Sequence, residues 1–312
     1  MRGWITDPDN EDGVVWRDDL DEPTPGPGRA VIQVQANSLN RGEILHVQRY
    51  RSLPPRTVPG WDVAGVVVEA ATDKTGPGVG SRVFGWSDRR GTWAERVALS
   101  VDRLAVTPEG LGVEDASTLG VAALTAYAAL GRCPVPLPGA HVVVTGATGG
   151  VGSFAVQLAQ LAGSKTTAVL RAGADPNGVQ LPDGVDLELG IDPDGPPADL
   201  VVDSVGGDVL AGALRRVGLG GTVVTLGRTL DEPSPLPPGW FQKHAQLHGL
   251  SFSRDYTAPG VTTAALTRIA GLVVGGRLTT NLSRVGNAED LVTLIDELVT
   301  RQARGKVVMR WA

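Results

Sequence analysis

A stretch of very small residues follows a run of β-branched residues near the middle of the chain, and its spacing suits phosphate binding. The sequence VVVTGATGGVG occupies positions 142–152, and the turn within it consists of Gly146, Ala147, Thr148, Gly149, Gly150, Val151 and Gly152. Glycine permits a tight bend with positive φ and lets another molecule approach the backbone. At the start of a following helix, exposed backbone amides would then bind a pyrophosphate.

The order of elements around this turn favours a dinucleotide site. A strand, a glycine-rich turn, a helix and a second strand follow one another, which is the context that the dinucleotide fingerprint requires. The common GxGxxG spacing would begin at Ala147, whereas a GxxGxxG spacing fits Gly146, Gly149 and Gly152. The alternative is a tight turn that binds nothing, and the complete strand–turn–helix order makes it the weaker interpretation.

The end of the next strand selects between the two nicotinamide dinucleotides. An NAD site usually carries Asp or Glu about 20 residues beyond the turn, where the carboxylate binds the ribose 2′-hydroxyl. Here the sequence TTAVLRAG places Arg171 at that point and no acid. Because a guanidinium suits a 2′-phosphate, the sequence predicts NADPH. An ordinary exposed arginine is the alternative.

Two later strands are predicted to end beside the same ligand. Cofactors bind at the carboxyl ends of the strands in a parallel sheet. Val205 and Gly206 end one predicted strand, and Leu226, Gly227 and Arg228 end the next. We expect these residues to border the nicotinamide and its ribose.

Alternating strands and helices would position these residues. The predicted strands are 141–145, 166–170, 199–205, 221–226 and 246–252, and the predicted helices are 150–162, 208–217 and 261–274. This alternation implies a parallel sheet covered on both faces. The first hundred residues are β-rich, with strands expected at 29–36, 63–70 and 81–86, and the chain closes with a helix and the strand GKVVMRW. The predicted α/β fold is a doubly wound Rossmann sheet (116–275) inserted in a β-rich domain (1–115 plus 276–312).

Composition excludes several classes of protein. The chain has 312 residues and a formal net charge of −6, with no basic cluster, so we expect no nucleic-acid partner. A single cysteine, Cys133, excludes an internal disulfide and a cysteine-based zinc site within one chain. The N-terminus lacks a signal pattern, and the longest apolar run is far shorter than the roughly 18–20 residues of a membrane span. We therefore expect a cytoplasmic protein with no membrane partner.

Short motifs along nearly the whole chain resemble those of the medium-chain dehydrogenase/reductase superfamily. They are NSLNRGEIL, VPGWDVAGVVVEA, GTWAERV, AALTAYAAL, GATGGVG, DLVVDSVGG, GGTVVTLG and GKVVMRW. The nearest resemblance is to the zinc-independent quinone oxidoreductase and enoyl reductase branch. It implies that the β-rich domain is GroES-like, and that the chain forms a homodimer by pairing of a strand edge near QLHGLSF.

Zinc members of this superfamily bind a catalytic metal through Cys, His and Cys. At the matching places this sequence has Asn40, Trp61 and Val121. Valine and tryptophan cannot ligate a metal, so an alcohol cannot be activated as a zinc alkoxide. Hydride must then go to a substrate that is already electrophilic, namely a quinone or an α,β-unsaturated carbonyl.

The resemblance also supplies three candidates for the reacting centre. Asn40 matches an asparagine that faces the substrate in related reductases, where its amide would donate to a carbonyl oxygen; satisfying the local backbone is the equal alternative. Tyr50 is the candidate proton donor, although the related tyrosine lies one residue further along, at Arg51, and a tyrosine in the pocket wall is the favoured alternative. Thr125 matches a threonine near the nicotinamide. His46, in the same segment as Tyr50, is expected to face solvent.

These observations leave three functions open. The first is an NADPH-dependent, metal-free reductase of quinones or α,β-unsaturated carbonyls. The second is a free-standing enoyl reductase of a polyketide-type pathway. The third is a non-catalytic NADPH-binding protein with a structural or sensory role.

Overall fold

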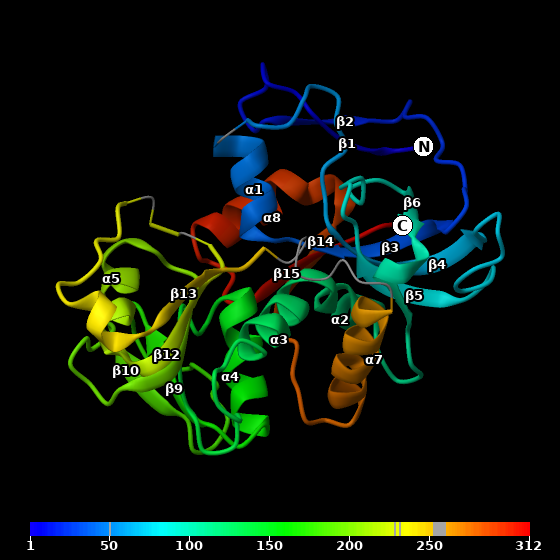
Figure 1. The fold of residues 1–312 in the computed structure, drawn as a ribbon. Helices are drawn as coiled ribbons and strands as arrows, with labels where there is room; N and C mark the ends of the chain where they lie inside the picture. The colour runs from blue at the N-terminus through cyan, green and yellow to red at the C-terminus, as the bar shows by residue number, and fades with distance from the viewer. Residues whose placement is uncertain (50, 228, 231, 252–259) are drawn as a thin grey trace. The chain divides into compact units, whose positions relative to one another are not determined.

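A computed structural model of residues 1–312 describes all of them except 50, 228, 231 and 252–259. The chain groups into two compact units, Met1–Leu124 with Tyr256–Ala312 and Thr125–Asp255 (Figure 1). The N-terminal and C-terminal segments therefore belong to one unit, and the middle of the chain forms the other.

The first unit is built on a mainly antiparallel sheet that contains the last strand of the chain. In spatial order its strands are β14 (Leu282–Asn287), β15 (Lys306–Arg310), β3 (Arg29–Ser38), β4 (Asp62–Glu69), β5 (Arg82–Trp86) and β7 (Leu104–Val106); β6 (Arg96–Ser100) also pairs with β3. Val308 of β15 lies opposite Ser38 of β3. β1 (Gly3–Thr6) and β2 (Val14–Arg17) form a separate antiparallel pair.

Short helices connect and cover these strands. They are α1 (Arg41–Ile44), η1 (Leu45–Arg49), η2 (Val101–Arg103), α2 (Val113–Ser117), η3 (Leu119–Ala123), α7 (Val261–Val274), η5 (Ala288–Asp290) and α8 (Leu291–Val299). The core of this unit joins residues far apart in sequence, among them Trp4, Ile32, Trp93, Leu294 and Met309. Burial of these large side chains is the main stabilising contribution.

The second unit is a six-stranded parallel sheet. Its spatial order is β10 (Asp186–Leu189), β9 (Lys165–Leu170), β8 (His141–Thr145), β11 (Ala198–Asp203), β12 (Val217–Thr225) and β13 (Gln246–Gly249). α4 (Gly150–Leu161) packs on β8 and β9, and α5 (Gly207–Arg216) packs on β11 and β12. α3 (Leu124–Leu130) precedes the sheet and η4 (Trp240–Lys243) precedes β13. The strand order reverses direction between β8 and β11, which is where doubly wound sheets bind ligands.

This sheet confirms the predicted doubly wound fold. β8, α4, α5 and α7 lie within a residue of the predicted bounds, whereas the short strands β1, β2, β6, β7, β10 and β14 were not predicted. The predicted division at 115 and 275 differs from the two compact units chiefly in α7. The hydroxyl of Thr263 in α7 donates to the carbonyl oxygen of Leu104 at 2.9 Å, so this helix packs with the first unit. Its apolar periodicity alone could not show which sheet it covers.

Among the described residues, the helices are too short or too polar to cross a bilayer.

Candidate active site

At two positions of the turn after β8, the local backbone and its close neighbours favour glycine. Gly146 has a φ of +60°, and a Cβ there would lie 2.6 Å from Oγ of Ser204. A Cβ on Gly152 would lie 2.2 Å from the carbonyl oxygen of Gly146. Gly152 requires glycine because the first turn of α4 lies directly against the backbone of the bend, whereas Gly146 favours glycine because of its positive φ and the nearby Ser204 side chain. Ala147 is buried in the same bend, and its amide donates to the Val169 carbonyl at 3.3 Å.

Gly149 has a different environment. It is exposed and immediately precedes α4, and within the described residues a Cβ there would contact only the Gly146 carbonyl oxygen, at 3.2 Å. No side chain of the described part of the chain caps the N-terminus of α4, and the first amides of a helix have no partner within it. Thr148, Gly150 and Val151 are half-buried beside this position. The bend therefore leaves room for an anion at the amides that carry the positive end of the helix dipole.

Five of the other predicted cofactor residues lie along the same edge of the sheet, because each follows the carboxyl end of a parallel strand. Arg171 follows β9 and is exposed. Val205 and Gly206 follow β11, where Gly206 has a φ of +80°. Leu226 and Gly227 follow β12. Arg228 and Tyr50 lie outside the described residues. Thr125 is buried in α3.

One residue of this edge escaped the sequence analysis. Asp203 is fully buried at the end of β11, and its carboxylate accepts hydrogen bonds from Oγ1 of Thr145 at 2.6 Å and from the amide of Gly206 at 3.0 Å. Burial raises the pKa of Asp203, and the two hydrogen bonds oppose that effect. Asp203 thus ties the end of β8 to the end of β11, where the strand order reverses. Its position at the end of the apolar run in DLVVDSVGG is the sequence signal that could have identified Asp203 as a residue of this edge.

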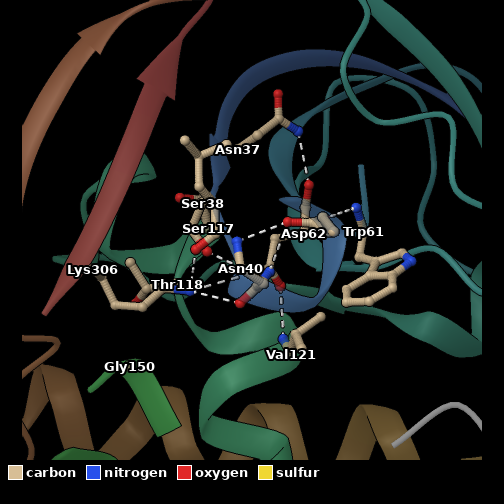
Figure 2. A network of polar contacts seen from close by, with 12 residues as sticks. Asn37, Ser38, Asn40, Trp61, Asp62, Ser117, Thr118, Val121, Gly150 and Lys306 are labelled. Carbon is tan, nitrogen blue, oxygen red and sulfur yellow. Dashed lines mark hydrogen bonds and ion pairs between the residues drawn. The ribbon is translucent and has the colours of Figure 1, made fainter. Parts of the chain in front are cut away.

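In the first unit, the side chain of Asn40 is fully engaged (Figure 2). Its Nδ2 donates to Oδ2 of Asp62 at 2.8 Å and to Oε2 of Glu43 at 3.3 Å. Its Oδ1 accepts a hydrogen bond from Nζ of Lys306 at 2.9 Å. An amide nitrogen has two hydrogens, and both are committed to carboxylates here. Of the two roles left open for Asn40, this geometry favours the local structural one over donation to a substrate carbonyl.

The three charged partners of Asn40 form a buried cluster. Glu43, Asp62 and Lys306 are 3%, 0% and 2% exposed, and Nζ of Lys306 lies 3.7 Å from Oδ2 of Asp62. Asp62 also accepts hydrogen bonds from the hydroxyl of Ser38 and, at 2.6 Å, from the amide of Val121. Five elements or turns therefore meet at these side chains. Sequence reasoning missed all three, because charged residues are rarely buried and these come from separate segments.

Burial determines how this cluster ionises. It raises the pKa of Glu43 to about 8, and the nearby Asp62 carboxylate adds to the rise. Burial also raises the pKa of Asp62, against the effect of Lys306, and lowers the pKa of Lys306, against the effect of the two carboxylates. The direct contact between Lys306 and Asp62 favours an ion pair of these two, while Glu43 holds a proton at neutral pH.

Trp61 and Val121 lie at the edge of this cluster. The amide of Trp61 donates to Oε1 of Glu43, and Asp62 begins β4 directly after it. The amide of Val121 is the donor to Asp62 described above. The three places that the resemblance assigns to metal ligands thus gather around the buried carboxyl groups of Glu43 and Asp62, of which Figure 2 labels Asp62.

Two family models match this chain. The alcohol dehydrogenase GroES-like domain matches residues 26–130, and the zinc-binding dehydrogenase domain matches residues 186–309. A probable mitochondrial zinc-binding oxidoreductase of Arthroderma benhamiae is 30% identical over 92% of this chain and 91% of its own length. The chain belongs to the medium-chain dehydrogenase/reductase superfamily. Membership places it among oxidoreductases that use a nicotinamide cofactor, and it confirms the GroES-like first domain.

The names of other relatives of this chain describe different kinds of protein. The human synaptic vesicle membrane protein VAT-1 homolog is 34% identical over 66% of this chain, and the match spans 55% of that protein. The chain therefore spans about half the length of this relative. A quinone oxidoreductase structure from Coxiella burnetii is 26% identical, with a TM-score of 0.80 over 99% of both chains. An alcohol dehydrogenase superfamily structure from Novosphingobium aromaticivorans is also 26% identical, with a TM-score of 0.86 over 99% of both chains.

The residues present do not fit the zinc that the second family model is named for. The Asn40 amide is held by Lys306 and the two carboxylates. The indole N–H of Trp61 is a donor only, and valine has no lone pair. Among the residues that the structure describes, no three His, Cys, Asp or Glu side chains are arranged to hold a metal ion. The donor chemistry of this site is therefore not that of a catalytic zinc centre.

Two further residues named in the sequence analysis, His46 and Cys133, are both half-buried. His46 is half-buried rather than solvent-facing, and its Nδ1 lies 2.7 Å from Oγ of Ser52. Cys133 is a half-buried free cysteine whose thiol pKa is raised by burial.

Proposed function

We propose that this protein is an NADPH-dependent, metal-free reductase that transfers hydride to a quinone or to an α,β-unsaturated carbonyl. The observation that carries this proposal is the closed network around Asn40. At the places where zinc members hold their metal, this chain has an amide engaged by Lys306 and Asp62, an indole and a valine. An acceptor bound here receives no Lewis-acid activation, so it must already be electrophilic.

The cofactor would be held by the carboxyl edge of the parallel sheet. The uncapped amides at the start of α4 and the open side of Gly149 suit a pyrophosphate. The exposed guanidinium of Arg171 suits a 2′-phosphate. Thr125, Val205, Gly206, Leu226 and Gly227 remain the candidates for the nicotinamide and ribose. When bound, NADPH supplies the hydride.

The protein's own contribution is orientation and exclusion of water. Because both amide hydrogens of Asn40 are committed to Asp62 and Glu43, Asn40 does not donate to the acceptor. After hydride transfer a quinone is a hydroquinone monoanion, which takes up one proton from water and needs no protein acid. The network therefore suits a quinone better than an acceptor that depends on a side-chain donor.

Named relatives support this class of acceptor. The Coxiella burnetii structure is a quinone oxidoreductase. A tomato protein that is 30% identical over 75% of this chain is a 2-methylene-furan-3-one reductase.

A second candidate is a free-standing enoyl reductase. A mycocerosic acid synthase-like polyketide synthase of Mycobacterium tuberculosis is 28% identical over 93% of this chain, which corresponds to 14% of that large protein. The acceptor would then be an enoyl thioester.

We also propose that the protein is a homodimer, formed through β13. This strand is at the edge of the parallel sheet and pairs with β12 on one side. Leu247 of β13 is 47% exposed and the neighbouring Phe241 is 77% exposed. An exposed apolar edge is a template for pairing with a second copy.

A substrate panel tests the proposed reaction. Purified protein is mixed with NADPH and a benzoquinone, a linear enone or an enoyl thioester, and loss of absorbance at the nicotinamide band is followed. Turnover of the quinone or the enone supports the proposal, and turnover of the thioester alone supports the enoyl reductase. NADPH binding without turnover of any acceptor contradicts both, and supports a non-catalytic NADPH-binding role.

A further inference from the structure

Both backbone groups of Trp61, its amide and its carbonyl oxygen, are hydrogen-bonded. Its amide donates to Oε1 of the buried Glu43, and its carbonyl oxygen accepts a hydrogen bond from the amide of Ser87 at 2.7 Å. Glu43 is itself fixed by the amide of Asn40 at 2.8 Å. The position of this tryptophan is therefore set by the same cluster that contains Lys306 and Asp62.

The indole ring of Trp61 packs against Gly42 and His46. A Cβ on Gly42 would lie 3.0 Å from both Cζ3 and Cη2 of Trp61, so the six-membered ring lies against the glycine backbone of α1. The ring of His46 stands edge-on to the indole, with centroids 6.2 Å apart and planes at 75°. Burial and the charge of Arg90 lower the pKa of His46, so this neighbour is neutral at neutral pH. The indole therefore packs against a glycine backbone and a neutral imidazole.

The indole is only half-buried, in contrast to the fully buried Trp86 and Trp93 of the same unit. Figure 2 shows it turned away from the polar side chains around Asp62. A large apolar ring that is held by its neighbours and is still half-exposed can bury a flat partner at little cost in side-chain entropy. Stacking favours partners with an extended π system, and a linear thioester or enone offers little such surface.

We propose that Trp61 is a specificity-determining residue, whose indole forms a fixed aromatic wall that favours flat conjugated acceptors such as naphthoquinone over linear enones. This inference rests on the proposed function, because it places the acceptor at the positions around Asn40. It goes further in choosing between the two acceptor classes and in naming the side chain that makes the choice.

Three variants separate this role from a general structural one. Trp61→Leu removes the aromatic face but keeps an apolar side chain, and Trp61→Phe keeps a smaller aromatic face. Gly42→Ala keeps Trp61 but displaces its indole ring, because the added Cβ would lie 3.0 Å from the ring. Trp16→Leu is the matched control, because the Trp16 ring contacts the rings of Trp4 and Trp311 instead. The melting temperature of each variant identifies any that fail to fold. If Trp61→Leu does not fold, Trp61→Phe and Gly42→Ala are compared with the wild type without it.

The first measurement is kcat/KM for naphthoquinone and for a linear enone with NADPH. We expect Trp61→Leu to lower the value for naphthoquinone about threefold to tenfold and to leave the enone within about twofold, as follows from the loss of one stacked pair. Gly42→Ala should act in the same direction, Trp61→Phe less, and Trp16→Leu equally on both acceptors. Equal loss of both acceptors in Trp61→Leu, or no loss of either, overturns the proposal.

The second measurement does not depend on turnover. Anaerobic calorimetry gives the Kd of naphthohydroquinone, which accepts no hydride, for the wild type and for Trp61→Leu. We expect the affinity to fall about threefold to tenfold in the variant. No binding to the wild type, or equal binding to both proteins, overturns the role of Trp61 even where the reductase activity is present. Absence of reductase activity together with this loss of affinity contradicts the proposed function alone.

Discussion

The ammonium of Lys306 donates a hydrogen bond to Oδ1 of Asn40 at 2.9 Å, and this contact joins the last strand of the chain to the turn that begins α1. The same ammonium lies 3.7 Å from the buried carboxylate of Asp62. A buried ion pair of this kind adds little net stability by itself, but removing one partner leaves the other charge unpaired.

Replacement of Lys306 by Met should therefore be strongly destabilising. We expect the free energy of unfolding to fall by about 3–5 kcal/mol, because Asp62 would stay buried without its cation. Urea unfolding at neutral pH measures this. Lys243→Met is the matched control, since Lys243 is half-buried and its Nζ donates to the carbonyl oxygens of Arg215 and Val217 at 2.8 and 2.7 Å. That loss should be about 1 kcal/mol, and similar losses in the two variants would contradict the account.

Glu43 should make stability depend on pH. Its pKa rises from 4.5 to about 8 on folding, so between these values the folded state holds a proton that the unfolded state has lost. Stability therefore falls as the pH rises through this window. The raised pKa of Asp62 acts in the same direction, whereas the lowered pKa of Lys306 acts in the opposite direction at higher pH.

Glu43→Gln removes this titration. We expect the free energy of unfolding of the wild type to decline between pH 4.5 and about 8, and that of the variant to decline less steeply. Urea unfolding at several pH values within the window gives both slopes. Identical slopes would show that Glu43 does not carry the proton.

The glycine turn offers a pair of matched substitutions. Gly149→Ala adds a Cβ on the open side of the bend, so the protein should fold with nearly unchanged stability but bind NADPH more weakly. Gly152→Ala brings a Cβ to 2.2 Å from the Gly146 carbonyl and should lower the melting temperature itself. Calorimetric titration with NADPH and thermal unfolding distinguish the two effects. Unchanged NADPH affinity in Gly149→Ala would place the pyrophosphate elsewhere.

Arg171 should determine the choice of dinucleotide. Arg171→Asp would remove the partner of the 2′-phosphate and supply an acceptor for a 2′-hydroxyl, so the NADPH to NADH ratio of kcat/KM should fall at least about tenfold. Arg215→Asp controls for the change of charge, because Arg215 is also exposed in the second unit but pairs with Asp194 at 2.7 Å. An equal change of the ratio in both variants would mean that net charge is responsible.

The edge strand β13 predicts the oligomeric state. Light scattering should give a dimer for the wild type, and Leu247→Glu should shift it toward the monomer because a carboxylate would be buried at the interface. A wild type that is monomeric at high protein concentration would contradict pairing through this edge.

The fold was more predictable than the site. The doubly wound sheet could be predicted because its strands are continuous apolar runs and its helices have a clear period, as at β8 and α4. β10 was missed because Asp186–Leu189 is short, largely exposed and half charged. The role of Asn40 could not be settled, because it depends on Lys306, which lies 266 residues away in sequence. Sequence patterns describe neighbours along the chain, whereas this cluster depends on contacts across it.

Hydride transfer from NADPH without a metal can be checked by a single comparison of rates. Oxidation of NADPH by naphthoquinone is followed at the nicotinamide band before and after exhaustive chelation, with the zinc content of both samples determined. If no metal takes part, the two samples have equal rates and contain far less than one zinc atom per chain. A rate that disappears on chelation and returns when zinc is added would contradict it.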